Sequence, residues 1–574
     1  MAQSTLDNLV FEMSKHTEKA GTPYLNKELT YLVDTNIGEY TSNQVEFDTT
    51  SMSNNGRFNS ISEGFFVFPL VVQLTGIDAQ NNAIAFNAGN QQYSDLCLAM
   101  KNSNLNLIHS VNIEYSNGNV IATKPYLNAY SLFLQNVSMN QEDEDMNGCF
   151  IGYAKDSSES WGYSADASTT GRGLYNNVVG TDVKNIFKAS KGSVNMGLTK
   201  RCSYINSSTG KGKELVMGDT ISSGLNYVEN TATAKNYYLY VVVRCQDLPF
   251  LSEMPMAQGT ILKITFTLNS NITFKFSKGA GGVLNLVGNL SNVSGYTNPF
   301  MVSANSTTVS GCAAAHAPAA NAIVDNNVVM SGSVGLPVGT YTVNSGLVKV
   351  NGVGHPLKKC RFYVNSYTFN PEYQASYTSN FSRVINYTDI AYSTLRIKVD
   401  GNSPTPFEGY INTGIAYAKR LIMIASLSVD DNGNGSENGG VKVHPFSSPF
   451  TTEPSTTSPF KLKDFNVYVA GNPIYARPIT YDYEQFLIEM NGQYGLNGNM
   501  IRGAVGSYIN YLDYANNYHY IVVNLSRQLD FDISSLRSIM VKGTIESKKS
   551  LEFHCFIETS KHITIDCRDG STIV

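Results

Sequence analysis

Apolar and polar residues alternate along many short segments of the chain, which is the pattern of half-buried β-strands. In the first half, the pattern predicts strands at 43–49, 63–75, 105–115 and 236–245. Between 260 and 276, two alternating runs flank Asn269-Ser270-Asn271, which predicts a β-hairpin. In the second half, the pattern predicts strands at 359–370, 382–398, 418–428, 520–525, 539–545, 551–557 and 563–567.

Helical spacing is confined to few segments. Residues 4–19 predict a short amphipathic helix with Ser4 and Asp7 as caps, and a frayed terminus is the alternative. A second helix is predicted directly after Pro125, because proline suits the first turn and the apolar residues that follow are three and four apart. These apolar residues are Tyr126, Leu127, Tyr130, Phe133 and Leu134.

The segment around this second helix occurs twice in the chain, at a constant offset of 353 residues. Residues 118–134 read GNVIATKPYLNAYSLFL, and residues 471–487 read GNPIYARPITYDYEQFL. Seven of these positions are identical, whereas roughly one identity is expected by chance. Alternating apolar residues precede both copies, displaced by one residue in the second, and Asn117-Gly118 predicts a tight hairpin turn. Each copy therefore predicts a strand, a turn, a short strand and a helix.

Two later landmarks recur in the same order. Asn236-Tyr237 with Val241-Val242 is echoed by Asn517-Tyr518 with Val522-Val523, and Gly259-Thr260-Ile261 by Gly543-Thr544-Ile545. An accidental recurrence of a generic strand–turn–helix is the alternative to duplication. We interpret the chain as two diverged copies of one β unit. The predicted fold class is all-β, with two jelly-roll β-sandwich domains in tandem, short helices and long loop insertions.

Length and composition support more than one domain. The chain has 574 residues, which exceeds what a single hydrophobic core usually holds. Charged residues make up only 15%, and such a polar, weakly charged composition favours strands and loops. The predicted division is an N-terminal arm (1–24), a first jelly roll (25–276) with a long insertion at about 138–230, an insertion or linker (277–356) and a second jelly roll (357–574).

Charge and cysteine usage restrict the partners and the compartment. The net charge is −5 without a Lys/Arg-rich run, so no direct sequence-specific nucleic acid partner is expected. We expect no transmembrane segment and no secretory signal, because neither an apolar run of sufficient length nor a basic region before an apolar core is present. Synthesis inside the cell, without secretion, is the expectation. The eight cysteines lack CxxC spacing, and we predict that they are reduced and buried: Cys97, Cys149, Cys202, Cys245, Cys312, Cys360, Cys555 and Cys567.

The search for catalytic chemistry yields no catalytic residue, no cofactor-binding residue, no metal ligand and no cofactor, so the chain is not expected to be an enzyme. The histidines show no metal-ligand spacing and are predicted to be exposed strand or turn residues: His16, His109, His316, His355, His444, His519, His554 and His562. The tract from Asp430 to Gly435 begins like a calcium loop, but Val441 stands at its twelfth position. The acidic run QEDED (141–145) and Asp430-Asp431 are interpreted as solvated loop charge.

The order of the landmarks resembles one protein family. The segments that carry the resemblance are TSNQVEFDTTS (41–51), EGFFVFPLVVQLTG (63–76), LIHSVNIEYSNGNVI (107–121), DLPFLSEMPMAQGTILKITFTLN (247–269), LKDFNVYVAGNPIYARPITYDYEQFL (462–487), YHYIVVNLSR (518–527) and ETSKHITIDCRDG (558–570). They are similar to the double jelly-roll major capsid proteins of icosahedral double-stranded DNA viruses, in the branch of polinton-like viruses, virophages and adintoviruses. The resemblance covers roughly 25–276 and 357–574, but not the excursions at 138–230 and 277–356.

The resemblance implies a structural role. Members of this family fold as two eight-stranded jelly rolls and assemble as homotrimers with a pseudo-hexagonal outline, which tile an icosahedral shell. The implied partners are neighbouring capsomers, a single-jelly-roll protein at the five-fold vertices (penton) and minor capsid proteins, and the implied location is the virion capsid. We hypothesise that 138–230 and 277–356 form the outer surface or trimer contacts, and that the N-terminal arm lies under the shell.

Two other functions remain open from the residues alone. Jelly rolls also serve as carbohydrate-binding or adhesin modules, although the lone Trp161 and the expected lack of secretion weigh against this. A glycoside hydrolase would need paired carboxylates that can lie far apart in the sequence. The fold class does not decide among these functions, because jelly rolls carry many unrelated activities.

Overall fold

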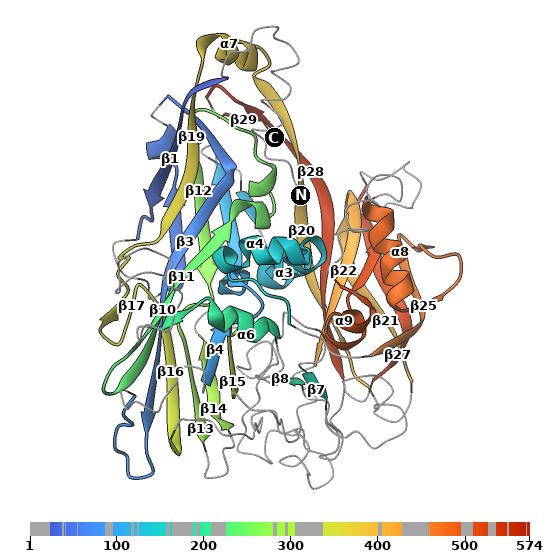
Figure 1. The fold of residues 1–574 in the computed structure, drawn as a ribbon. Helices are drawn as coiled ribbons and strands as arrows, with labels where there is room; N and C mark the ends of the chain where they lie inside the picture. The colour runs from blue at the N-terminus through green and yellow to red at the C-terminus, as the bar shows by residue number, and fades with distance from the viewer. Residues whose placement is uncertain are drawn as a thin grey trace.

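The structure is a computed structural model, and Figure 1 shows that β-sheets dominate it. The all-β fold class is thereby confirmed. The residues that the structure describes are 23–36, 40, 42–53, 56–86, 96–115, 120–122, 125–156, 161–163, 188–190, 196–207, 226–278, 284–292, 297–304, 337–399, 404–427, 457, 460–494, 509–525, 535–547, 550–569 and 571–573.

The second half of the chain forms a jelly roll. One sheet has the order β20 (Ser382–Ile397), β28 (Leu551–Asp566), β22 (Ala418–Leu427) and β26 (Ile521–Asn524). The facing sheet has the order β21 (Thr405–Ile415), β27 (Arg537–Glu546), β23 (Lys461–Val469) and β24 (Asn472–Pro473), and β25 (Ile479–Tyr481) also pairs with β23. Numbered along the chain, the sheets run 1-8-3-6 and 2-7-4-5. This interleaved antiparallel order is that of the eight-stranded jelly roll.

The first half repeats this strand order. One sheet contains β1 (Tyr24–Val33), β19 (Arg361–Phe369), β3 (Phe58–Ile77) and β11 (Ala234–Arg244) as successive neighbours. The facing sheet runs β2 (Gln44–Asp48), β12 (Leu262–Leu268), β5 (Ile108–Tyr115) and β6 (Val120–Ala122). These eight strands again give 1-8-3-6 and 2-7-4-5. The strand order of the chain itself therefore defines a double jelly roll.

The first jelly roll carries additional strands. The far half of β3 pairs with β16 (Gly339–Leu347), which continues to β13 (Ile272–Lys278) and β14 (Leu284–Asn292). At the other edge, β11 continues to β10 (Tyr227–Asn230) and β9 (Asn206–Ser207). The shorter pairs are β4 (Leu96–Met100) with β15 (Phe300–Ala304), β17 (Lys349–Val350) with β18 (Val353–Gly354), β7 (Trp161–Tyr163) with β8 (Lys188–Ser190), and β29 (Thr572–Ile573) with β28. Both sequence excursions thus contribute strands to the first sheet.

Helices occupy the connections between strands. They are α2 (Thr50–Ser53), α3 (Leu127–Ser138), α4 (Gln141–Ile151), α6 (Met196–Ser203), α7 (Pro371–Ser379), α8 (Tyr483–Tyr494) and α9 (Tyr511–Asn516), with 3-10 turns η2 (Asn104–Leu107), η4 (Cys245–Asp247) and η5 (Leu251–Glu253). Helix α7 was not predicted; the Asn370 side chain accepts from the Glu372 amide at its start, and Pro371 occupies the first turn. It links the two jelly rolls (Figure 1).

The duplicated segment occupies the same place in both jelly rolls. Strand β5 with β6 and helix α3 in the first corresponds to β23 with β24, β25 and helix α8 in the second. The one-residue displacement between the copies has a structural cause. Five residues separate Glu114 from its partner Val120, whereas four separate Tyr468 from its partner Pro473. The slip is therefore a hairpin connection that is one residue shorter in the second copy, where Ala470 and Gly471 have positive φ angles of 50° and 82°.

The hairpin predicted between 260 and 276 is wrong, although both strands exist. Strand β12 pairs with β2 and β5, whereas β13 pairs with β14 and β16 in the other sheet. The connecting residues are held by other segments, since the Asn269 amide donates to the Asn106 carbonyl (3.1 Å) and the Ser270 hydroxyl bonds to Asn43 Oδ1 (2.8 Å). Alternation predicted two half-buried strands correctly, but it does not specify their partners.

The strand pairing also moves residues between the predicted domains. The sequence interpretation assigned 357 onward to the second jelly roll, whereas β19 pairs with β1 and β3 in the first. We propose that the boundary lies at α7.

Strand β21 was missed, since Pro406 and Gly409 interrupt its pattern, and the two runs predicted within 551–567 form the single strand β28. The helix predicted at 4–19 and the calcium-like tract at 430–435 lie outside the described residues.

Candidate functional site: the interface between the two jelly rolls

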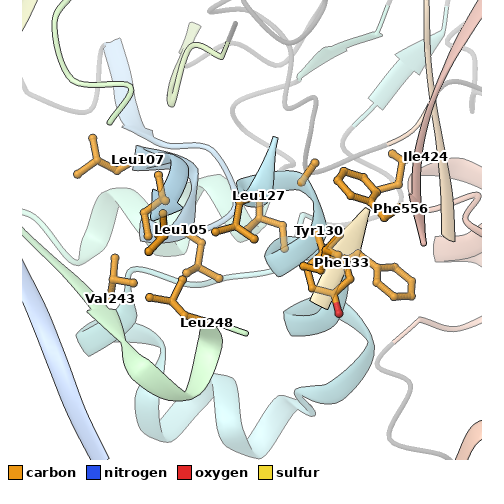
Figure 2. Close-up of a cluster of buried hydrophobic side chains, with 14 of the residues drawn as sticks. Leu105, Leu107, Leu127, Tyr130, Phe133, Val243, Leu248, Ile424 and Phe556 are labelled. Carbon is orange, nitrogen blue, oxygen red and sulfur yellow. The ribbon is translucent and has the colours of Figure 1, made fainter. Parts of the chain in front are cut away.

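Helix α3 of the first jelly roll lies between the two domains (Figures 1 and 2). Figure 2 shows Tyr130 and Phe133 near Phe556 and Ile424 of the second jelly roll, with Leu127 on the side of the first. The ring centroids of Tyr130 and Phe556 are 5.8 Å apart. Ten of the twelve residues of α3 are buried, as expected for a helix with packing partners all round. The helix therefore belongs to the cores of both jelly rolls.

The surface that receives α3 is the outer face of the sheet β20-β28-β22-β26. Along β28, Phe553, Cys555 and Ile557 point to one side and His554, Phe556 and Glu558 to the other, because side chains alternate in a strand. All six are buried. The second set contacts α3 and its neighbours, so β28 is covered on both faces. The outer face of this sheet, which is normally exposed to solvent, is therefore part of the core.

A buried ion pair lies at the centre of this interface. Arg420 Nε donates to Glu558 Oε2 at 2.8 Å, and Arg420 Nη2 donates to Oε1 of the same carboxylate. Tyr130 of α3 donates its hydroxyl hydrogen to Glu558 Oε1 at 2.7 Å. The Arg420 and Glu558 side chains are only 5% and 6% exposed. A bidentate pair with a third donor from the other jelly roll is geometrically demanding, so it fixes the position of α3 on the sheet.

An aromatic and histidine cluster surrounds the start of α3. The ring centroids of Tyr126 and His554 are 4.8 Å apart, and Tyr126 also lies 5.4 Å from Tyr392. His554 Nδ1 shares a hydrogen bond with the Tyr392 hydroxyl (2.8 Å), and its Nε2 lies 3.4 Å from Ser426 Oγ. Ser426 and His554 are at most 1% exposed, so no substrate reaches them and their proximity serves packing. Burial also lowers the pKa of the neighbouring His109.

A polar layer extends the interface beyond α4. Lys155 Nζ lies 2.6 Å from Asp513 Oδ2 of α9, and both side chains are at least nine-tenths buried. Asn517 Nδ2 donates to the Asp156 carbonyl (3.3 Å), and the Asp156 carboxylate pairs with Arg201 at 2.8 Å. Removing such groups from water is costly unless each finds a partner. Part of the 138–230 excursion is therefore built into the domain interface.

The acidic run at 141–145 is not loop charge, which corrects the sequence interpretation. It opens helix α4, where Asn140 and Asp143 form a capping box. Glu144 is buried and accepts from Lys200 Nζ (2.9 Å) and from the Lys155 amide (3.1 Å). The capping pattern at Asn140 could have predicted this helix. Its long-range lysine partner could not be predicted, since it lies 56 residues away in the chain.

A third contact joins the jelly rolls near α7. Gln258 donates its amide hydrogen to the Cys567 carbonyl (3.0 Å), and the Tyr377 hydroxyl donates to the Met256 carbonyl. Gly259 has a positive φ of 74°, and a Cβ there would lie 2.7 Å from the Asp569 carbonyl oxygen. Glycine is required here both by conformation and by the close approach of the second jelly roll.

The predicted environments of histidine and cysteine are partly wrong. The structure buries four histidines that were predicted to be exposed, namely His109, His355, His519 and His554, whereas His562 is exposed as predicted. The described buried cysteines are Cys202, Cys245, Cys360, Cys555 and Cys567, all of them free thiols. Cys149 is exposed, against the prediction, because it lies on the solvent side of α4. Five further side chains lie outside the part that the structure describes: those of Cys97, Cys312, His16, His316 and His444.

Among the described residues, no group of three or more His, Cys, Asp or Glu residues is placed to hold a metal ion. None of the described helices is both long enough and apolar enough to span a membrane. A cavity of about 240 Å³ lies beside α8, with walls of Lys461, Leu462, Lys463, Thr480, Tyr481, Asp482, Tyr483, Tyr511, Tyr514, Ala515 and His519.

Comparisons with known proteins find similarity at the level of solved structures. No protein-family model matches this chain, and no curated protein matches it. A chain in the cryo-EM structure of the Sputnik virophage is 12% identical, with a TM-score of 0.49 over 97% of this chain and 89% of that one. The mavirus major capsid protein is 9% identical, with a TM-score of 0.46 over 97% and 91%. A chain of the PBCV-1 virus capsid is 10% identical, with a TM-score of 0.35 over 97% and 99%.

The mavirus and PBCV-1 structures are of viral capsid components. The likeness is distant. The double jelly-roll assignment therefore rests on the strand order of the chain itself.

Proposed function

We propose that this chain is a major capsid protein that self-assembles as pseudo-hexameric trimers, which tile an icosahedral viral shell. The observation that carries the proposal is the duplication: two jelly rolls of identical strand order are held in one block by the buried helix α3. A chain with two similar units presents two similar lateral surfaces. Three such chains approximate six-fold packing, which allows neighbouring trimers to surround each trimer in a flat array.

The joined domains support a building block better than a binding or catalytic module. Tyr130, Arg420 and Glu558 lock the jelly rolls together through buried side chains. In a tile, a fixed angle between the two units is needed, since every copy must present the same outline. The chain is accordingly proposed to have no enzymatic activity.

The proposed partners follow from the same role. They are two further copies in the homotrimer, neighbouring capsomers, a vertex protein with a single jelly roll and minor capsid proteins, with the virion capsid as the location. The excursions at 138–230 and 277–356 are proposed to reach the outer surface or the trimer contacts. Limited proteolysis of assembled particles tests this, since cleavage that spares both excursions while cutting elsewhere would contradict it.

The deciding experiment is the solution mass of the purified chain by light scattering, with negative-stain imaging of the same peak. The expected species has a mass near 188 kDa, three times the chain mass of 62.7 kDa, and a hexagonal outline. A stable 62.7 kDa monomer would refute self-assembly into capsomers by this chain alone.

The tyrosine-lined cavity beside α8 favours one alternative, carbohydrate binding, because aromatic rings with nearby polar groups suit sugar rings. Tyr481, Tyr483 and Tyr511 would supply the rings, and Asp482 and Lys463 the polar groups. A glycan array screened with the purified chain tests this function. Binding that is lost in Tyr511→Ala would support it, whereas an array without signal would exclude it.

A further inference from the structure

The contact within one chain uses two surfaces, and each of them occurs a second time at an end of the molecule. In the interface described above, α3 of the first jelly roll covers the outer face of the sheet β20-β28-β22-β26. The equivalent sheet of the first jelly roll is β1-β19-β3-β11, and the equivalent helix of the second is α8. Figure 1 shows β1 and β19 at one side of the molecule and α8 at the opposite side. The block thus has one unused sheet face and one unused helix side.

The unused sheet face is apolar and aromatic. Tyr31, Tyr363 and Phe65 lie side by side on β1, β19 and β3, with ring centroids 5.5 Å and 4.9 Å apart. The side chains of Leu29 and Tyr31 are 56% and 52% exposed. Apolar groups gathered on an outer sheet face are typical of a protein interface.

The second jelly roll carries a similar row on the equivalent three strands, and α3 covers that row. There, Tyr392, Phe556 and Ile422 are paired across β20, β28 and β22, the same three strand positions. Tyr126 and Tyr130 of the α3 segment pack on this covered row. In the first jelly roll, Phe150 of α4 contacts only the Phe65 end of the row (ring centroids 5.3 Å apart), and Tyr31 at the other end is 52% exposed.

The unused helix side contains the cavity beside α8. Seven of its wall residues, 461–463 and 480–483, correspond at the offset of 353 to 108–110 and 127–130. In the first jelly roll, this is where His109 and Tyr130 lie, next to Tyr392, His554 and Phe556 of the neighbouring sheet. The cavity is therefore the second-copy counterpart of a place that a sheet face fills in the first copy.

Helices α8 and α9 beside this cavity carry exposed apolar residues. Tyr511, Ile488 and Leu512 are 63%, 55% and 51% exposed. Tyr483, the counterpart of Tyr130, forms one wall. A second sheet face placed here would bury these side chains and fill the cavity, which is the same gain that α3 obtains inside the chain.

We infer that the face of Tyr31, Tyr363 and Phe65 on one copy docks against α8 and α9 of a second copy, over the cavity. This inference rests on the proposed trimeric function and specifies its subunit interface. The contact is head-to-tail, because the two surfaces differ. If each contact between chains repeats the geometry of the contact within a chain, three chains close a ring of six jelly rolls.

Two charge-introducing variants test the interface, Tyr31→Glu on the sheet face and Tyr511→Glu on the helix side. Each variant alone is expected to shift from about 188 kDa to 62.7 kDa by light scattering, because each loses one half of every contact. An equimolar mixture is expected to give a species near 125 kDa, twice the chain mass. In the mixture, the intact face of Tyr511→Glu can dock on the intact helix side of Tyr31→Glu, but the ring cannot close.

The matched control is Ile77→Glu, which changes another exposed apolar residue (44% exposed). Ile77 ends β3, twelve residues along that strand from Phe65 and so roughly 40 Å away. It should remain trimeric. Unchanged circular dichroism and thermal midpoint establish that each variant folds, and Tyr31→Ala and Tyr511→Ala replace a variant that does not.

The outcomes separate the two proposals. A trimeric parent whose Tyr31 and Tyr511 variants both stay trimeric overturns this interface and leaves the capsomer role standing. A mixture without the 125 kDa species contradicts head-to-tail docking. A parent that is monomeric overturns the capsomer role and this interface together.

Discussion

The ion pair beneath α3 allows a quantitative test of how the two jelly rolls are joined. We consider Glu558→Gln, which keeps the shape of the side chain but removes its charge. In the native interface, Glu558 accepts two hydrogen bonds from Arg420 and one from Tyr130, and both charged side chains are at most 6% exposed. After the substitution, the Arg420 guanidinium stays buried without its counter-charge.

The expected loss follows from this geometry. Breaking a buried ion pair by removing one partner costs about 3–5 kcal/mol, because the remaining charge has lost both water and its partner. Tyr130→Phe removes only the hydrogen bond from the first jelly roll to the carboxylate, so we expect a loss of about 1.5–3 kcal/mol. The matched control is Glu546→Gln, whose pair with Lys463 is exposed (48% and 28%) and whose loss should stay within about 1 kcal/mol.

The assay is urea unfolding at a fixed protein concentration, followed by far-UV and near-UV circular dichroism. Because residues from both jelly rolls form one continuous core, the two signals should change together in the parent. Since Tyr130 and Glu558 act on one another, the loss from Tyr130→Phe should be smaller when Glu558→Gln is already present. A loss in Glu558→Gln no larger than in Glu546→Gln would refute the argument, as would strictly additive losses in the double variant.

Three further predictions concern His355, Gly259 and Cys149. Burial lowers the pKa of His355 from 6.5 to about 4, so its contribution to stability is present above pH 6.5 and is lost as the pH falls toward 4, by about 3 kcal/mol. In His355→Asn, which keeps an acceptor for the Leu357 amide, urea midpoints should depend less on pH over this range. Gly259→Ala should lower stability by about 1–3 kcal/mol through its positive φ and its contact with Asp569, measured by urea unfolding. Maleimide should label Cys149 in the native protein, as mapped by mass spectrometry of peptides.

Each of these predictions has its own control. Equal pH dependence of the parent and His355→Asn would contradict the assignment to His355. Gly471 also has a positive φ (82°) but open space around its Cβ position, so Gly471→Ala isolates backbone strain, and an equal loss in both glycine variants would rule out the contact with Asp569. The buried thiols should react only after unfolding, and native labelling of any of them would contradict their burial: Cys202, Cys245, Cys360, Cys555 and Cys567.

The sequence by itself determined the repeating unit of this protein. Alternation at Val111, Ile113 and Tyr115 predicted strand β5, and the spacing from Leu127 to Leu134 predicted helix α3, because these patterns depend only on which side of an element is buried. The offset of 353 residues predicted that the unit recurs, and even the shorter hairpin connection of the second copy was visible as a one-residue slip. Local pattern and duplication thus gave the all-β class and the two jelly rolls.

Only the tertiary structure decided which strands pair and what the two jelly rolls share. The pattern of β19 is the same whichever sheet receives it, so its place beside β1 and β3 was assigned to the wrong domain. Glu558 and Arg420 are 138 residues apart, and Tyr130 is 428 residues from Glu558, so no local pattern links them. Burial of His554 likewise depends on α3 covering an outer sheet face, which sequence periodicity cannot indicate because it reports the exposure within one element and not the partner that removes water from it.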